Sequence, residues 1–167
     1  MLLGDGSPTR HLQLLTNQET KIQLISMQLD PLSNQEGPRE LNQLKGPLIR
    51  RQVWINNQNK NLAWAESWWN AEQVSENLKA KEEPIWKNLT QDRSELFREV
   101  DSISLVNSKW LEDKFVFKGP FWSRNYRFFR DKKPLTIIRE VFNPYLETLL
   151  GPSGINEFTK LYSSSSS

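Results

Sequence analysis

An arginine falls on the apolar face of an expected β-strand, where an anion would be its natural partner. Side chains alternate between the two faces of a strand. In residues 48–56 this alternation puts Arg51 on the face that carries the isoleucines and the valine, whereas Arg50 points the other way. Because a planar guanidinium can bind a carboxylate through two hydrogen bonds, Arg51 is a candidate for holding an anionic ligand.

Two more charges fall on apolar faces further along the chain. Arg124 shares a strand face with three aromatic residues, and Glu140 shares one with Ile138 and Phe142. A buried charge is costly unless it is paired, so these side chains need partners. The pattern leaves two alternatives open. One is a structural ion pair between Glu140 and either Arg51 or Arg124, and the other is a pocket whose arginines bind the carboxylate of a ligand.

The composition restricts the classes of protein and of site. The 167 residues are 37% hydrophobic and include seven Trp and eight Phe, which favours a folded domain over a disordered chain. There is no cysteine and only one histidine, so we expect neither disulfides nor a metal site. The net charge of +2 is too balanced for a dedicated nucleic-acid binder. With no apolar run of transmembrane length and no signal peptide at the start, we expect a cytoplasmic protein without a transmembrane segment.

The order of expected elements predicts an α+β fold. Strands are expected at residues 20–29, 48–56, 62–69, 102–106, 121–130 and 135–142. A polar segment at residues 31–47 is expected to be a loop, residues 84–100 a helix, and a short helix is expected to begin at Asn143-Pro144 and end by Gly151. These elements predict a single antiparallel β-sheet of about six strands with helices inserted between hairpins.

Four blocks of residues carry a resemblance to a known family. The blocks are LLGDGSPTR at 2–10, RQV at 51–53 with AES at 65–67, PIWKNL at 84–89 with RE at 98–99, and FWSR at 121–124 followed by KPL at 133–135 and EVFNP at 140–144. In their order and spacing they are similar to the chorismate pyruvate-lyase (chorismate lyase) family, in particular to its cyanobacterial and red-algal plastid branch. They indicate one chorismate-lyase-like domain over residues 1–150. Residues 151–167, rich in Gly and Ser, are expected to be a flexible tail.

The resemblance implies a cofactor-free enzyme that converts chorismate to 4-hydroxybenzoate and pyruvate, for the head group of plastoquinone. It implies that Arg51 binds the ring carboxylate and that Glu140 meets the 4-oxygen of the ring. Backbone amides at Pro8 and Ile85 would complete the pocket. We assign Arg124 to the enolpyruvyl carboxylate. The expected partner is a small-molecule substrate bound by a monomer, with no nucleic acid.

Several residues depart from the family pattern. Pro8 has no N–H, so either Thr9 supplies the backbone donor or the contact with the carboxylate is lost. Trp86 stands where many members of the family have Gly. Leu2 and Leu3 look like the last turn of a preceding helix, which suggests either a misassigned start codon or a truncated copy. These departures keep an alternative open, namely a non-catalytic module of the same fold that binds 4-hydroxybenzoate or a similar aromatic acid.

Overall fold

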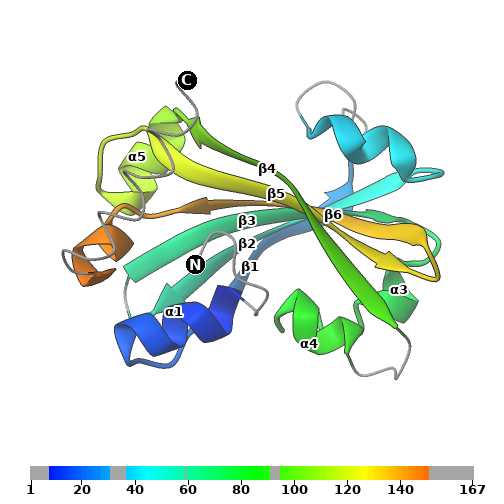
Figure 1. The fold of residues 1–167 in the computed structure, drawn as a ribbon, viewed down its shortest axis with the longest axis horizontal. Coiled ribbons are helices and arrows are strands. Elements are labelled where there is room, and N and C mark those ends of the chain that lie inside the picture. Colours follow the sequence, from blue (N-terminus) through cyan, green and yellow to red (C-terminus); the bar gives the residue numbers. More distant parts are fainter. Residues whose placement is uncertain (1–7, 31–36, 59, 91–94, 151–167) are drawn as a thin grey trace, which may run out of the picture.

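Six strands form one antiparallel sheet in the order β1-β2-β3-β6-β5-β4 (Figure 1). The computed structural model describes residues 8–30, 37–58, 60–90 and 95–150. The strands are β1 (Lys21–Leu29), β2 (Leu48–Asn57), β3 (Lys60–Asn70), β4 (Leu96–Val106), β5 (Phe121–Arg130) and β6 (Lys133–Phe142). Two meanders, β1 to β3 and β4 to β6, therefore meet at the β3–β6 pair. The expected α+β fold with one six-stranded sheet is confirmed.

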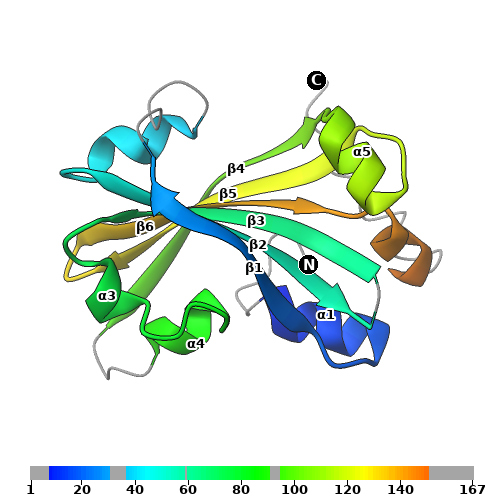
Figure 2. The ribbon, with the colours of Figure 1, turned by 180° about the vertical axis from the view of Figure 1, so that it is seen from behind.

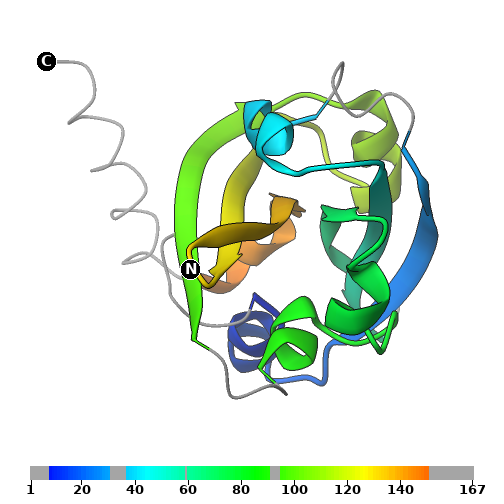
Figure 3. The same ribbon diagram turned by 90° about the vertical axis from the view of Figure 1, so that its right-hand side faces the viewer.

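Short helices cover both faces of this sheet. They are α1 (Pro8–Thr16), the 3₁₀ helix η1 (Arg39–Gln43), α3 (Val74–Asn77), α4 (Ile85–Leu89), α5 (Lys109–Phe115) and the helical residues 145–150. The face under α1, α3 and α4 is called the inner face here, and the face under α5 and η1 the outer face (Figures 1 and 2). The sheet is curled, so its edge strands β1 and β4 stand on opposite sides of the molecule (Figure 3). No helix in the described ranges has the length and apolar character needed to cross a membrane.

Apolar side chains from the helices pack on both faces of the sheet. On the inner face Leu12 of α1 packs against Ile55 and Phe142, and Leu89 of α4 packs near Trp69. On the outer face, Leu111 and Phe115 of α5 cover a cluster that contains Trp54, Trp64 and Val141. Burial of each large apolar side chain stabilises the fold by about 1.5–3 kcal/mol. These contacts fix α1 and α4 against the same face of the sheet.

The helix expected over residues 84–100 is wrong. Within the described residues of that range only α4 is helical, and β4 begins at Leu96, six residues before the strand expected at 102–106. Leu96 and Val100 fit a helical spacing of four, but a spacing of four also keeps two side chains on the same face of a strand. Pairing with β5 decides between the two, since β4 is hydrogen-bonded along its whole length to that strand. This difference matters for the site, because it turns Arg98 toward the inner face.

The other five expected strands are present and differ from the prediction only at their ends, whereas η1, α3 and α5 were not predicted. The turn between β5 and β6 is formed by Asp131 and Lys132, both with positive φ (51° and 62°), the conformation of a type I′ hairpin turn. The expected loop at 31–47 contains η1, whose Leu41 is buried. The helix expected after Asn143 is present at 145–150, and the Asn143 side chain accepts a hydrogen bond from the N–H of Tyr145 at 2.9 Å. The Leu2-Leu3 turn and the tail at 151–167 lie outside the described residues.

The residue that caps the C-terminus of α5 is unfavourable for the conformation it adopts. Val116 caps this helix in the left-handed conformation, with φ 58°, and its side chain is 84% exposed. A β-branched residue is strained there, whereas glycine is not. Val116→Gly should therefore raise the free energy of unfolding by about 1 kcal/mol in urea titrations. Val116→Ala is the control and should gain much less, because alanine keeps a Cβ. Equal gains in the two variants would show that φ is not the cause.

Candidate active site

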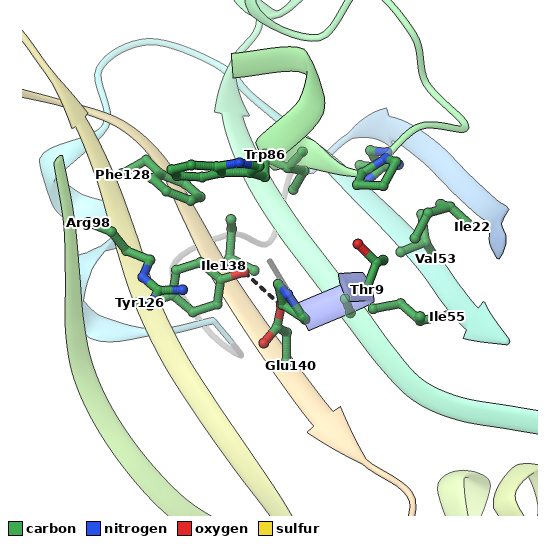
Figure 4. Close-up of a pocket in the computed structure, with 15 residues that line it drawn as sticks. Thr9, Ile22, Val53, Ile55, Trp86, Arg98, Tyr126, Phe128, Ile138 and Glu140 are labelled. Atoms are coloured by element: carbon green, nitrogen blue, oxygen red, sulfur yellow. Dashed lines mark hydrogen bonds between the residues drawn. The ribbon is translucent and has the colours of Figure 1, made fainter. Parts of the chain in front are cut away.

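A cavity lies on the inner face, beneath α1 and α4 (Figure 4). Its polar wall is formed by Thr9, Arg51, Arg98, Tyr126 and Glu140. The other lining residues are Pro8, Ile22, Val53, Ile55, Ala65, Pro84, Ile85, Trp86, Phe128 and Ile138. This combination of an apolar wall with a few converging polar groups is typical of small-molecule sites.

Arg51 is a buried cation that has no carboxylate partner in the described part of the chain. It is 2% exposed, and its Nε and Nη2 donate to the carbonyl of Lys81 at 3.0 and 2.6 Å. Nη2 also donates to the carbonyl of Glu83 at 3.2 Å. Burial lowers the pKa of the Arg51 guanidinium to about 10, since no nearby anion offsets the loss of water. An anion that entered the cavity would find this charge already desolvated.

Glu140 lies in the middle of the polar wall and is held from two sides. Nη2 of Arg124 donates to Glu140 Oε2 at 2.6 Å, and Nε donates to the same oxygen at 3.2 Å. The Tyr126 hydroxyl donates to Oε1 at 2.7 Å, the bond drawn in Figure 4. All three side chains are at most 3% exposed. The carboxylate is therefore fixed in position while it still borders the cavity.

The charges around Glu140 reinforce one another. Burial alone would lower the pKa of Arg124, but Glu140 outweighs burial, so the pKa of Arg124 is raised. Burial, together with the nearby charge of Glu140, raises the pKa of Tyr126 well above its usual value. Tyr126 therefore stays protonated and continues to donate its hydrogen bond. The carboxylate of Glu140 can accept a further hydrogen bond from a ligand hydroxyl on the cavity side.

The helices α1 and α4 contribute backbone groups and an aromatic side chain to the cavity wall. Thr9 borders the cavity from the start of α1, next to Pro8. Ile85 is the first residue of α4, and its N–H has no acceptor among the described residues, as is usual for a first helical turn. Trp86 follows it and lies across Phe128 with ring centroids 6.0 Å apart (Figure 4). The tryptophan that replaces the family's frequent glycine thus forms part of the cavity wall.

The structure brings five of the six predicted site residues to one cavity. Arg51, Glu140, Pro8, Thr9 and Ile85 all line it. The sixth, Arg124, lies behind Glu140 and pairs with it, so one of the two structural ion pairs left open by the sequence is present. That ion pair and the pocket are not alternatives, because the same carboxylate belongs to both.

Two polar residues that line the cavity, Tyr126 and Arg98, were missed by the reasoning from sequence. Tyr126 shares a strand face with Arg124, so the same alternation could have identified it. Arg98 was hidden by the wrong helix at 84–100, since its inward direction follows only from a strand. It lies over the ring of Tyr126, with its guanidinium carbon 5.6 Å from the ring centroid.

A second buried carboxylate, Glu66, lies on the opposite face of the sheet. It does not contact Arg51. Its side chain is fully buried between Arg50 and Arg139, and both guanidiniums also stand over the ring of Trp68. Arg50 and Arg51 are neighbours in sequence that serve different faces, as their alternation predicted.

Comparison of the sequence with known families gives one match over most of the chain. The family model described as "Chorismate pyruvate-lyase Rv2949c-like" matches residues 2–150. A protein of Cyanophora paradoxa named "Uncharacterized protein ycf21" is 38% identical over 148 residues, which are 88% of this chain and 77% of that protein. A protein of the same name from Pyropia yezoensis is 36% identical over 148 residues, 88% of this chain and 80% of that protein.

Solved structures share the fold at low sequence identity. The C-terminal domain of the histidine utilization repressor of Pseudomonas syringae has a TM-score of 0.60 and 11% identity, covering 75% of this chain and 92% of that one. The effector domain of PhnF from Mycobacterium smegmatis has a TM-score of 0.59 and 10% identity, covering 84% of this chain and 90% of that one. At such identities the likeness concerns the fold alone.

Proposed function

The chain belongs to the Rv2949c-like chorismate pyruvate-lyase family, and we propose that it catalyses the cofactor-free conversion of chorismate to 4-hydroxybenzoate and pyruvate. The observation that carries this proposal is that Arg51 and Glu140 line the same cavity. Arg51 is a buried cation that donates to backbone carbonyls among the described residues, and Glu140 is a fixed hydrogen-bond acceptor. Chorismate carries a ring carboxylate and a hydroxyl on the opposite ring carbon, which suit these two groups.

The reaction needs little chemistry from the protein. Chorismate loses the enolpyruvyl ether at ring carbon 3 and the hydrogen at ring carbon 4, and the new double bond makes the ring aromatic. The departing fragment, with that hydrogen formally added, is pyruvate, so the atoms balance without an oxidant or reductant. Aromaticity drives the reaction. The protein has to orient the substrate, offset its negative charges and exclude water.

Each polar group then has a role at a stated part of the substrate. The guanidinium of Arg51 binds the ring carboxylate, at a strength of about 4 kcal/mol for an effective dielectric constant near 20 and a separation of about 4 Å, before desolvation is counted. Glu140 accepts a hydrogen bond from the 4-hydroxyl. The backbone N–H groups of Ile85 and of Thr9, the latter in place of Pro8, are the proposed donors to carboxylate oxygens. Trp86 closes the cavity above the ring.

In this proposal Arg124 acts through Glu140. Since its guanidinium lies against Oε2 of the carboxylate, it holds Glu140 in place. The role that the sequence suggested for it, contact with the enolpyruvyl carboxylate, needs a side chain that lines the cavity, which Arg124 does not. In this proposal 4-hydroxybenzoate is a precursor of a quinone head group, that of plastoquinone.

Incubation of the purified protein with chorismate tests the proposal. We expect 4-hydroxybenzoate, followed by its absorbance, and pyruvate, followed with lactate dehydrogenase, to appear in equal amounts and without added metal or cofactor. The two rates should be equal, because one elimination yields both products. Release of neither product would contradict catalysis.

The same samples test the alternative that the module binds without reacting. Titration calorimetry with 4-hydroxybenzoate measures binding directly. Binding without product release would support a non-catalytic module, a possibility raised by the effector domain that shares the fold. Absence of both binding and release would contradict the assignment of the cavity itself.

A further inference from the structure

A second arginine borders the cavity on the wall away from Arg51. Arg98 comes from β4, at one edge of the sheet, whereas Arg51 comes from β2 near the other edge. Four strand spacings of about 4.8 Å separate these strands, roughly 19 Å along the sheet surface. Because the sheet is curled, side chains from both strands reach the same cavity (Figure 3). The cavity therefore has a cation at each of two opposed sides.

Glu140 lies between the two arginines in the order of the strands. The strand order places β6 midway, two steps from β2 and two steps from β4. Figure 4 shows Arg98 beside Tyr126 and Glu140 further into the cavity, with Val53 and Ile55 of β2 on the far side. Across the sheet the sequence of groups is cation, hydrogen-bond acceptor, cation.

We propose that Arg98 binds the second carboxylate of the substrate and selects a dianion over a monoanion, an inference that rests on the proposed function. The order of groups along chorismate matches the order across the sheet. The ring carboxylate is at one end, the 4-hydroxyl at the other end of the ring, and the enolpyruvyl carboxylate projects from the neighbouring carbon. With the first at Arg51 and the hydroxyl at Glu140, the last group extends toward β4.

This assignment has a consequence for the release of product. The contact with Arg98 exists only while the enolpyruvyl group is attached to the ring. Cleavage divides the two carboxylates between two molecules, so 4-hydroxybenzoate keeps the contact with Arg51 and loses the one with Arg98. Arg98 therefore favours substrate over product, and its removal should affect the two ligands unequally.

The test compares two unreactive ligands in calorimetry with wild type and Arg98→Gln. The first ligand is 4-hydroxybenzoate, a monoanion. The second is 3-carboxymethoxy-4-hydroxybenzoate, which has an ether-linked carboxylate at the position of the enolpyruvyl group. We expect Arg98→Gln to weaken the binding of the dianion about tenfold or more, and tenfold is the lower end of the range for hydrogen bonds to charged groups. The binding of the monoanion should weaken by less than about threefold. Arg98→Lys should recover part of the loss, because it keeps the charge.

Arg39→Gln is the matched control, since Arg39 is an exposed arginine of η1 on the outer face. It changes the net charge equally and should alter neither affinity. Equal weakening of both ligands by Arg98→Gln would overturn the proposal, and so would no weakening of either. The result does not depend on turnover. If wild type releases no pyruvate, the proposed lyase activity fails, yet this comparison still decides the role of Arg98.

Discussion

Arg51→Ala is expected to weaken the binding of 4-hydroxybenzoate by about 100-fold or more and to remove measurable lyase activity. The reason is that Arg51 is the desolvated cation of the cavity, and truncation of a buried hydrogen-bonded charge costs about 2–5 kcal/mol in binding. Calorimetry measures the affinity, and the release of pyruvate measures the activity. Arg51→Lys should lie between wild type and alanine, because lysine keeps the charge but not the planar fork.

Arg50→Ala is the control for this prediction. Arg50 is next in sequence and on the outer face, where it pairs with Glu66. Its removal should lower the melting temperature while the activity per folded molecule stays within a few-fold of wild type. Equal losses of affinity in the two alanine variants would contradict the assignment of Arg51 to the site.

The affinity should also depend on pH in a way that identifies Arg51. Its pKa of about 10 means that the free protein loses this positive charge as the pH rises through that value. A bound carboxylate favours the charged form, so affinity should be constant at lower pH and fall above about pH 10. Benzoate is the suitable probe because it has no group that titrates in this range. Constant affinity up to pH 11 would show that the ligand does not bind to Arg51.

Glu140→Gln is expected to lower kcat/KM at least about tenfold, which corresponds to roughly 1.4 kcal/mol of transition-state stabilisation. It should also destabilise the fold, because Arg124 then lies buried beside a neutral amide. Removal of one partner of a buried pair costs about 3–5 kcal/mol, and an amide that still accepts a hydrogen bond should cost less. Urea unfolding measures the stability, and initial rates are expressed per folded molecule.

Glu66→Gln is the control that separates the effect of Glu140→Gln on kcat/KM from its effect on stability. Glu66 is equally buried and is paired with two arginines, but on the outer face. It should lose stability to a similar extent and keep wild-type kcat/KM. If both variants keep full activity per folded molecule, Glu140 belongs to the scaffold only and not to the site.

The sequence by itself determined the direction of the side chains on its well-defined strands. Alternation with period two assigned Arg51, Arg124 and Glu140 each to the apolar face of its own strand and Arg50 to the opposite face of Arg51. The sheet confirms these directions, and its register places all three on the inner face. This succeeds because side-chain direction in a strand is a local property of the backbone, which the apolar pattern reveals. The resemblance to the lyase family added the positions at Pro8 and Ile85, which line the same cavity.

Only the tertiary structure decided which charges meet. Local pattern could not choose between Arg51 and Arg124 as the partner of Glu140, because strand order determines which side chains lie side by side. Arg124 faces Glu140 directly across the β5–β6 pair, whereas Arg51 is two strands away, bound to carbonyls of the segment before α4. The residues around Arg98 form a strand and not a helix because they pair with β5. The local pattern could not decide this, since a spacing of four residues is compatible with both.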